Sequence, residues 1–242
     1  MIGSKRVLAV APARGGSKGI PLKNLRPVDG VPMVARVGHL VREITMIDRA
    51  VVSTDHEDIA HAAEESGLAV PFRRPREISG DRIGDIDVLT HALIEIERID
   101  GVTYDVIAML QPTSPLRRAE HVTACIELLV NGNYDAVWSM SETDSKGHPL
   151  KQLVITDSKV DYYDSAGAAI VARQQLTPVY HRNGICYAMT RECILEQKTI
   201  KGRRTGALVL EGNFVSIDTE WDLSLVEFIL SRQRRMPDGG GN

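Results

Sequence analysis

The sequence has few cysteines, no excess of positive charge and no long apolar run. Its 242 residues include only three cysteines, Cys125, Cys186 and Cys193. They are odd in number and too widely spaced for a disulfide framework or a thiolate metal motif. The apolar run at residues 7–13 is too brief for a signal sequence or a membrane span. We therefore expect a cytoplasmic protein that has reduced thiols and does not enter a membrane.

The balance of charges argues against nucleic acid as a partner. The chain has 29 lysines and arginines against 32 aspartates and glutamates, and its net charge is −3. This charge gives no general attraction to a polyanion. Hydrophobic residues make up 43% and charged residues 25% of the sequence, which are ordinary values for a globular protein. A disordered or fibrous chain is therefore not indicated.

Segments of strand and helix length alternate along the first 140 residues. Predicted strands cover residues 7–11, 50–53, 104–110 and 136–140. Predicted helices begin with Pro32 in the first turn, after a cap at Thr54 or Asp55, at Asp85 and at Arg118. This alternation is typical of a mostly parallel sheet with right-handed crossovers. We therefore predict an α/β fold of three layers, in which a twisted, mostly parallel sheet lies between helices.

The alternation changes between residues 141 and 188. Residues 153–155 and 160–163 flank the sequence TDS, as the strands of an antiparallel hairpin flank a turn. We interpret this region as an inserted β region that covers a substrate or reaches another subunit. A last amphipathic helix is predicted over residues 220–235, and the glycines of the tail, 236–242, favour disorder. The chain up to residue 235 is expected to form a single domain.

The segment that follows the first predicted strand has the composition of a polyphosphate site. It reads ARGGSKGIPLKN, residues 13–24, and together with Arg26 it contains four cations and no acidic residue. Its glycines allow backbone amides to approach an anion, and open parallel sheets bind ligands at the carboxyl ends of their strands. The segment is neither a Walker A loop nor a GxGxxG loop. Taken alone, it fits a phosphate site and an ordinary solvated turn equally well.

Six further motifs follow this loop along the chain. They are VSTDHEDIAHAA, RRPREISGD, LQPTSPLR, HPLK, RQQLTPVYHRNGICY and IDTEWDL. Together with the loop they resemble the ordered motifs of the acylneuraminate cytidylyltransferases, also called CMP-sialic acid synthetases, over about residues 5–230. Kdo cytidylyltransferases share the general fold, but their loop differs from GGSKGIPLKN. The resemblance implies a Rossmann-like nucleotidyltransferase that joins CTP to a nonulosonic acid, such as N-acetylneuraminate or legionaminate, and releases pyrophosphate.

The resemblance also implies roles for individual residues. Those that would bind the nucleotide are Arg14, Gly15, Ser17, Lys18, Lys23, Asn24, Arg74 and Asp81. Those that would bind the sugar acid are Gln111, Lys151, Arg173, Asn183 and Tyr187. Arg14, Lys18 and Lys23 would also be catalytic, because cations offset the charge that develops on the leaving pyrophosphate. Tyr187 fits a core aromatic position equally well.

A metal ion is implied at Asp218, which would also be catalytic. Asp218 matches a family carboxylate that holds Mg²⁺ or Mn²⁺, and a hard cation of this kind is bound by one or two carboxylates and substrate phosphates. Asp218 fits equally well as the cap of the helix that begins near Thr219. Many relatives have a second carboxylate where this chain has Ser216, so one metal ion and two remain alternatives.

Other departures from the family bear on the substrate. Gly84 and Asp85 stand where relatives usually carry two serines, and His181 stands where they usually carry arginine. These changes suggest a sugar acid other than N-acetylneuraminate, for example a legionaminate-like or amino-bearing one. Alternative functions are a Kdo or other octulosonate cytidylyltransferase and a non-catalytic nucleotide-binding relative. The family further implies a homodimer built on the inserted β region.

Overall fold

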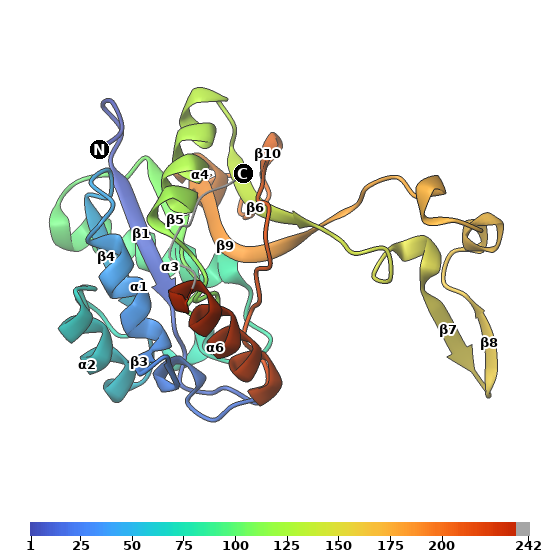
Figure 1. Cartoon of the computed structure of the whole chain (residues 1–242). Coiled ribbons are helices and arrows are strands. Elements are labelled where there is room, and N and C mark those ends of the chain that lie inside the picture. The colour runs from blue at the N-terminus through green and yellow to red at the C-terminus, as the bar shows by residue number, and fades with distance from the viewer. Residues whose placement is uncertain (236–242) are drawn as a thin grey trace.

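A six-stranded sheet forms the centre of the computed structural model, which describes residues 1–235 (Figure 1). Its order is β10-β6-β9-β5-β1-β4. The bounds are β1 Val7–Pro12, β4 Arg49–Ser53, β5 Val106–Met109, β6 Ala136–Glu142, β9 Tyr180–Thr190 and β10 Thr205–Val209. Strand β9 runs antiparallel to both of its neighbours, and the other strand pairs of this sheet are parallel. The prediction of a mostly parallel sheet is confirmed.

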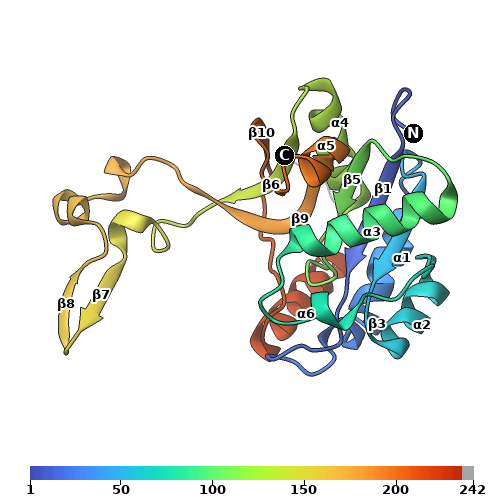
Figure 2. The same cartoon turned by 180° about the vertical axis from the view of Figure 1, so that it is seen from behind.

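Helices cover both faces of the sheet because successive strand residues point to opposite sides. In β1, Val7, Ala9 and Ala11 pack against α1, α2 and α4, whereas Leu8 and Val10 pack in a second cluster with α3 and α5. Figure 2 shows α3 and α5 on the face that is turned away in Figure 1. The bounds are α1 Met33–Val41, α2 Glu57–Ser66, α3 Asp85–Asp100, α4 Ala119–Asn131 and α5 Arg191–Leu195. The predicted three layers are therefore present.

The last helix lies against the segment that follows β1. Helix α6, Glu220–Arg235, buries Leu223 and Val226 in a small cluster with Ile20 and Met33. The same region contains the 3-10 turn η1, Lys23–Leu25, and the short antiparallel pair β2, Pro27–Val28, and β3, Val31–Pro32. Pro32 therefore ends a strand and precedes α1, instead of occupying its first turn. This packing brings the C-terminal part of the chain next to the basic loop.

An arm, residues 143–179, projects from the sheet between β6 and β9 (Figures 1 and 2). The arm contains strand β7, Leu153–Thr156, and strand β8, Lys159–Tyr162, which pair antiparallel as the predicted hairpin requires. Among the described residues, these two strands pair only with each other. The 3-10 turns of the arm are η3 Pro149–Lys151, η4 Ser165–Ala169 and η5 Arg173–Gln175. The inserted region predicted at 141–188 extends into the main sheet at both ends, because its first two residues belong to β6 and its last nine to β9.

Three further predictions concern the cysteines, a membrane-spanning segment and the C-terminal tail. The three cysteines are free and buried. No helix within residues 1–235 has the length and apolar character needed to cross a membrane. The tail predicted at 236–242 lies outside the described residues.

Candidate active site

A cavity of about 480 Å³ lies at the carboxyl ends of β1 and β5. It is lined by the loop after β1, the segment between α2 and α3, the loop after β5 and the residue preceding the cap of α6. The residues singled out from the sequence that line it are Arg14, Ser17, Lys18, Lys23, Asn24, Arg74, Asp81, Gln111 and Asp218. Four segments far apart in the sequence thus meet at one site, at the edge where parallel sheets bind their ligands.

The basic loop is held in place by hydrogen bonds at both ends. Asn24 is buried, and its Nδ2 donates to the backbone oxygen of Arg14 over 2.9 Å. The amide of Gly15 donates to Asp55 Oδ1 over 2.9 Å. A Cβ at Gly15 would lie 2.8 Å from the His56 ring, so a larger residue at this position would displace His56. Asn24 and Gly15 therefore fix the shape of the loop that presents the cations.

Asp55 positions the basic loop, a role that the sequence did not indicate. Thr54 or Asp55 was predicted to cap the next helix, but α2 begins at Glu57 and its N-cap is His56, without a side-chain cap bond. The Asp55 carboxylate instead reaches across to the amide of Gly15. The available signal was the position of Asp55 two residues after the end of β4, the strand beside β1.

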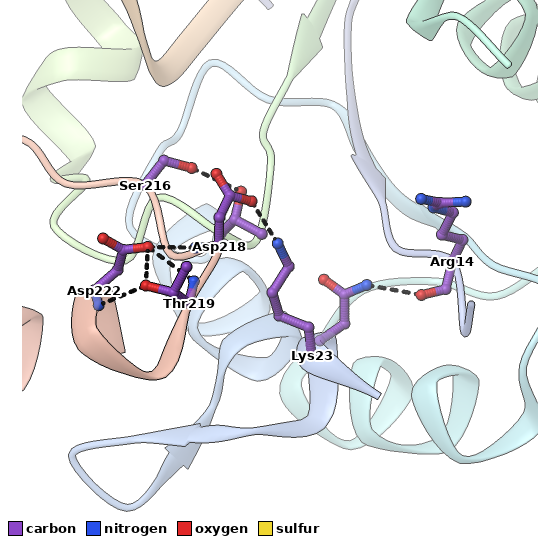
Figure 3. A network of polar contacts seen from close by, with 8 residues as sticks. Arg14, Lys23, Ser216, Asp218, Thr219 and Asp222 are labelled. Carbon is purple, nitrogen blue, oxygen red and sulfur yellow. Dashed lines mark hydrogen bonds and ion pairs between the residues drawn. The ribbon is translucent and has the colours of Figure 1, made fainter. Parts of the chain in front are cut away.

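The cations of the loop are paired with two carboxylates of the cavity. Asp81 accepts from Arg14 Nη1 and from Lys18 Nζ, each over 2.6 Å. The hydrogen bonds from Lys18 and then Arg14 hold the pKa of Asp81 below its usual value. Lys23 Nζ lies 2.7 Å from Asp218 Oδ1 (Figure 3). Three cations thus converge on the cavity with exposed carboxylates as partners, which the phosphates of a ligand can replace.

Asp218 is free to face the cavity because another residue caps α6. Asp222 Oδ2 accepts from the amides of Asp218 and Thr219 over 3.0 and 2.8 Å, and the Asp222 amide donates to Thr219 Oγ1 over 3.2 Å (Figure 3). Thr219 and Asp222 therefore form the cap. The alternative that Asp218 serves as the cap is wrong. Ser216 Oγ lies 3.3 Å from Thr113 Oγ1, which joins this segment to the loop after β5.

Two buried arginines support the site: Arg74 lines the cavity, whereas Arg117 does not line it and anchors the loop after β5. Arg74 Nε donates to Ser53 Oγ over 3.0 Å, and its Nη2 donates to the Ser53 carbonyl. Arg117 donates to the carbonyls of Gln111, Gly184 and Ile185, and thereby ties the loop after β5 to β9. Burial lowers the pKa of each arginine to about 10, so both are charged at neutral pH. The role of Arg117 was missed, because no local feature of LQPTSPLR marks it as buried.

Asn183 ties β9 to β6, Tyr187 bonds within β9, and neither side chain lines the cavity. Asn183 Oδ1 accepts from Ser139 Oγ over 2.6 Å, and its Nδ2 donates to Ser141 Oγ over 3.1 Å. Tyr187 Oη accepts from the Gly184 amide over 2.9 Å, and burial raises its pKa. Both side chains are buried. The structure thus places Tyr187 as a core aromatic, the second of the two roles considered for it.

Comparison with known proteins identifies the family. The family model described as cytidylyltransferase matches residues 8–231 of the chain. The chain belongs to the cytidylyltransferase family. The resemblance seen in the sequence is therefore confirmed, and the chain is a nucleotidyltransferase.

Several relatives resemble this cytidylyltransferase over most of its length. It is 30% identical to the CMP-N,N'-diacetyllegionaminic acid synthase of Legionella pneumophila, with 93% of this chain and 96% of the relative covered. It is 34% identical to an N-acylneuraminate cytidylyltransferase of Streptococcus agalactiae; the match covers 89% of this chain and 51% of the relative. The structure of a CMP-2-keto-3-deoxy-manno-octonic acid synthetase complexed with CTP has a TM-score of 0.69 and 17% identity, covering 95% of this chain and 100% of the other. This last likeness establishes the fold alone.

The cytidylyltransferase has a donor set suited to a metal ion that is held largely by substrate. Within residues 1–235, no three His, Cys, Asp or Glu side chains are grouped to bind a metal by themselves. The Asp218 side chain is 74% exposed, and its Oδ2 has no protein partner among these residues. Mg²⁺ is commonly bound by one or two carboxylates, water and substrate phosphates. Asp218 therefore fits this kind of site.

Lys151 and Arg173 lie in the arm, away from the cavity of their own chain (Figures 1 and 2). Arg173 lines a separate cavity of about 500 Å³, together with His148, Gln174 and residues 142–145 and 176–179. Neither residue joins the lining of the cavity that contains the basic loop. One chain therefore brings together the predicted nucleotide-binding residues and Gln111, but not the two cations expected for the sugar acid.

Proposed function

We propose that this cytidylyltransferase joins CTP to a nonulosonic acid and forms the CMP-sugar and pyrophosphate. The observation that carries the proposal is the convergence of Arg14, Lys18 and Lys23 on one cavity with Asp218. Cations arranged in this way suit a triphosphate. The relatives named for legionaminic acid and N-acylneuraminate support the class of the second substrate.

In the proposed reaction, the anomeric hydroxyl oxygen of the sugar acid attacks the α-phosphorus of CTP. A new oxygen–phosphorus bond forms, the bond to the bridging oxygen of the β-phosphate breaks, and the hydroxyl proton passes to solvent. Arg14, Lys18 and Lys23 would stabilise the charge that accumulates on the departing pyrophosphate. Mg²⁺ or Mn²⁺ held by Asp218 and the phosphates would withdraw electrons from the α-phosphate. The protein contributes position and charge, so no covalent intermediate is required.

The second substrate would enter beside Gln111, which lines the cavity at the end of β5. We propose that Lys151 and Arg173 bind its carboxylate from the arm of a second copy, in a homodimer. The arm exposes large apolar side chains that its own chain leaves uncovered, including Leu153, Ile155 and Val160 at 55%, 74% and 62% exposure. A surface of this kind favours a protein partner.

An activity screen tests the proposed function. CTP and Mg²⁺ are incubated with N-acetylneuraminate, legionaminate, pseudaminate or Kdo, and pyrophosphate release is measured together with the CMP-sugar by mass spectrometry. Reactions without a sugar acid and reactions with excess EDTA are the controls. We expect turnover with at least one nonulosonic acid. Turnover with Kdo alone would favour an octulosonate cytidylyltransferase, and no turnover with any acid would favour a non-catalytic nucleotide-binding protein.

A further inference from the structure

The cavity wall between η2, Arg76–Ile78, and the first turns of α3 combines apolar surface with a carboxylate. Ile78, Ile83 and Val88 line the cavity on this side, together with Asp85. The cations of the basic loop line the same cavity. A nucleobase has apolar faces and polar edges, so it fits a wall of aliphatic side chains with one polar group among them. A sugar acid carries hydroxyl groups on most of its carbons and matches such a wall less well.

Asp85 differs from the other two carboxylates of the cavity because it lacks a partner. Asp81 and Asp218 each accept a hydrogen bond from a cation of the basic loop. Asp85 is half-buried and forms no hydrogen bond or ion pair with any side chain within residues 1–235. Burial raises its pKa, and the positive charges of Arg182 and Arg74 oppose this effect. A partly desolvated carboxylate of this kind gains most from a donor supplied by a ligand.

The two pyrimidine nucleotides differ at the edge that a carboxylate can distinguish. Cytosine carries an amino group at position 4, which is a donor, whereas uracil carries a carbonyl oxygen, which is an acceptor. An ionised carboxylate is an acceptor only. We propose that Asp85 accepts a hydrogen bond from the 4-amino group of cytosine and thereby makes the enzyme select CTP over UTP. This inference rests on the proposed use of CTP and assigns the residue that reads the base.

The first helical position of α3 gives Asp85 an alternative role. An acidic residue in a first turn stabilises the helix through its dipole, whether or not it contacts a ligand. Asp87 lies in the same turn, is exposed and does not line the cavity. It is therefore a matched control that shares the helix effect and lacks the proposed contact.

The test compares CTP with UTP in the wild-type enzyme, Asp85→Asn and Asp87→Asn. The asparagine amide both donates and accepts, so it tolerates either base. We expect Asp85→Asn to lower the ratio of kcat/KM for CTP over UTP by about 10-fold or more, the effect of losing a hydrogen bond to a charged group. Asp87→Asn should leave the ratio unchanged. An unchanged ratio in Asp85→Asn would overturn the proposal, as would an equal fall in both variants.

A binding measurement keeps this test independent of the sugar acid. Thermal protection is measured with Mg²⁺ and either CTP or the analogue in which hydrogen replaces the 4-amino group. Wild type should be protected more strongly by CTP, and Asp85→Asn should be protected equally by both; Asp85→Ser serves the same purpose if the asparagine variant does not fold. Equal protection of wild type by the two nucleotides would refute the role of Asp85. A failure of wild type to release pyrophosphate with any sugar acid would instead refute the proposed reaction.

Discussion

Replacement of Lys23 by alanine should lower kcat strongly while it changes the thermal stability of the protein little. Lys23 Nζ lies 2.7 Å from Asp218 Oδ1, and the two side chains are 15% and 74% exposed. Because the carboxylate is open to solvent, the pair contributes at most about 1 kcal/mol to folding. Its loss should lower Tm by about 2–4 °C in a chain of this size. Removal of a charge that stabilises the leaving group costs about 10²- to 10³-fold in kcat.

A second ion pair between the same parts of the chain supplies the control. Arg26 Nη2 lies 2.8 Å from Glu220 Oε2 and therefore also joins the basic segment to α6. Arg26 does not line the cavity. Arg26→Ala should change Tm about as much as Lys23→Ala, by the few degrees that an exposed pair contributes, and should leave kcat within about 3-fold of wild type.

The assay is continuous detection of pyrophosphate at saturating CTP and sugar acid, with Tm measured by differential scanning fluorimetry on the same preparations. Two results would refute the reasoning. If Lys23→Ala retained more than a tenth of the wild-type kcat, the lysine would not stabilise the leaving group. If Arg26→Ala lost as much activity as Lys23→Ala, both losses would reflect a displaced α6.

Three further substitutions test other parts of the site. The resemblance implies that Asp81 binds the nucleotide, but its ion pairs with Arg14 and Lys18 make it a competitor of the phosphates. Asp81→Asn should therefore tighten CTP binding several-fold at low ionic strength; weaker binding in calorimetric titration would show instead that Asp81 contacts the nucleotide directly. Asp222→Ala should lower stability by about 1 kcal/mol through loss of the helix cap, and a Tm equal to that of wild type would contradict this. Arg173→Ala should raise KM for the sugar acid while CTP still protects the protein thermally, and an equal loss of both would argue against a sugar-binding role.

The order of the main elements could be predicted because local apolar patterns differ between buried strands and amphipathic helices. The helix expected to begin at Asp85 runs from Asp85 to Asp100. The direction of β9 could not be predicted, because its buried run from Asn183 to Met189 suits a strand in either direction. Direction depends on β5 and β6, which are distant in sequence.

In the candidate site, too, residues that share one segment could be predicted, whereas residues that act on distant parts of the chain could not. Arg14, Lys18 and Lys23 share one loop at a strand end, so a single segment marked them as candidates, and the six motifs that follow were needed to assign their role. Asp55 and Arg117 act through hydrogen bonds to residues 40 and 67 positions away. Such partners depend on how the strands are ordered in the sheet. Sequence motifs therefore identify residues whose side chains can bind a ligand more readily than residues that hold a loop in place.

The arm bears on both the assembly and the second substrate. Its hairpin consists of two strands of four residues each, with exposed apolar side chains and no further strand to pair with among residues 1–235. A lone two-stranded hairpin is at best marginally stable in water, so a second copy that covers it would stabilise the arm and bring Arg173 to a cavity. If sugar binding depends on this contact, dilution below the dimer dissociation constant should abolish turnover and leave CTP binding intact. Constant specific activity for a species that sedimentation identifies as a monomer would show that one chain binds both substrates.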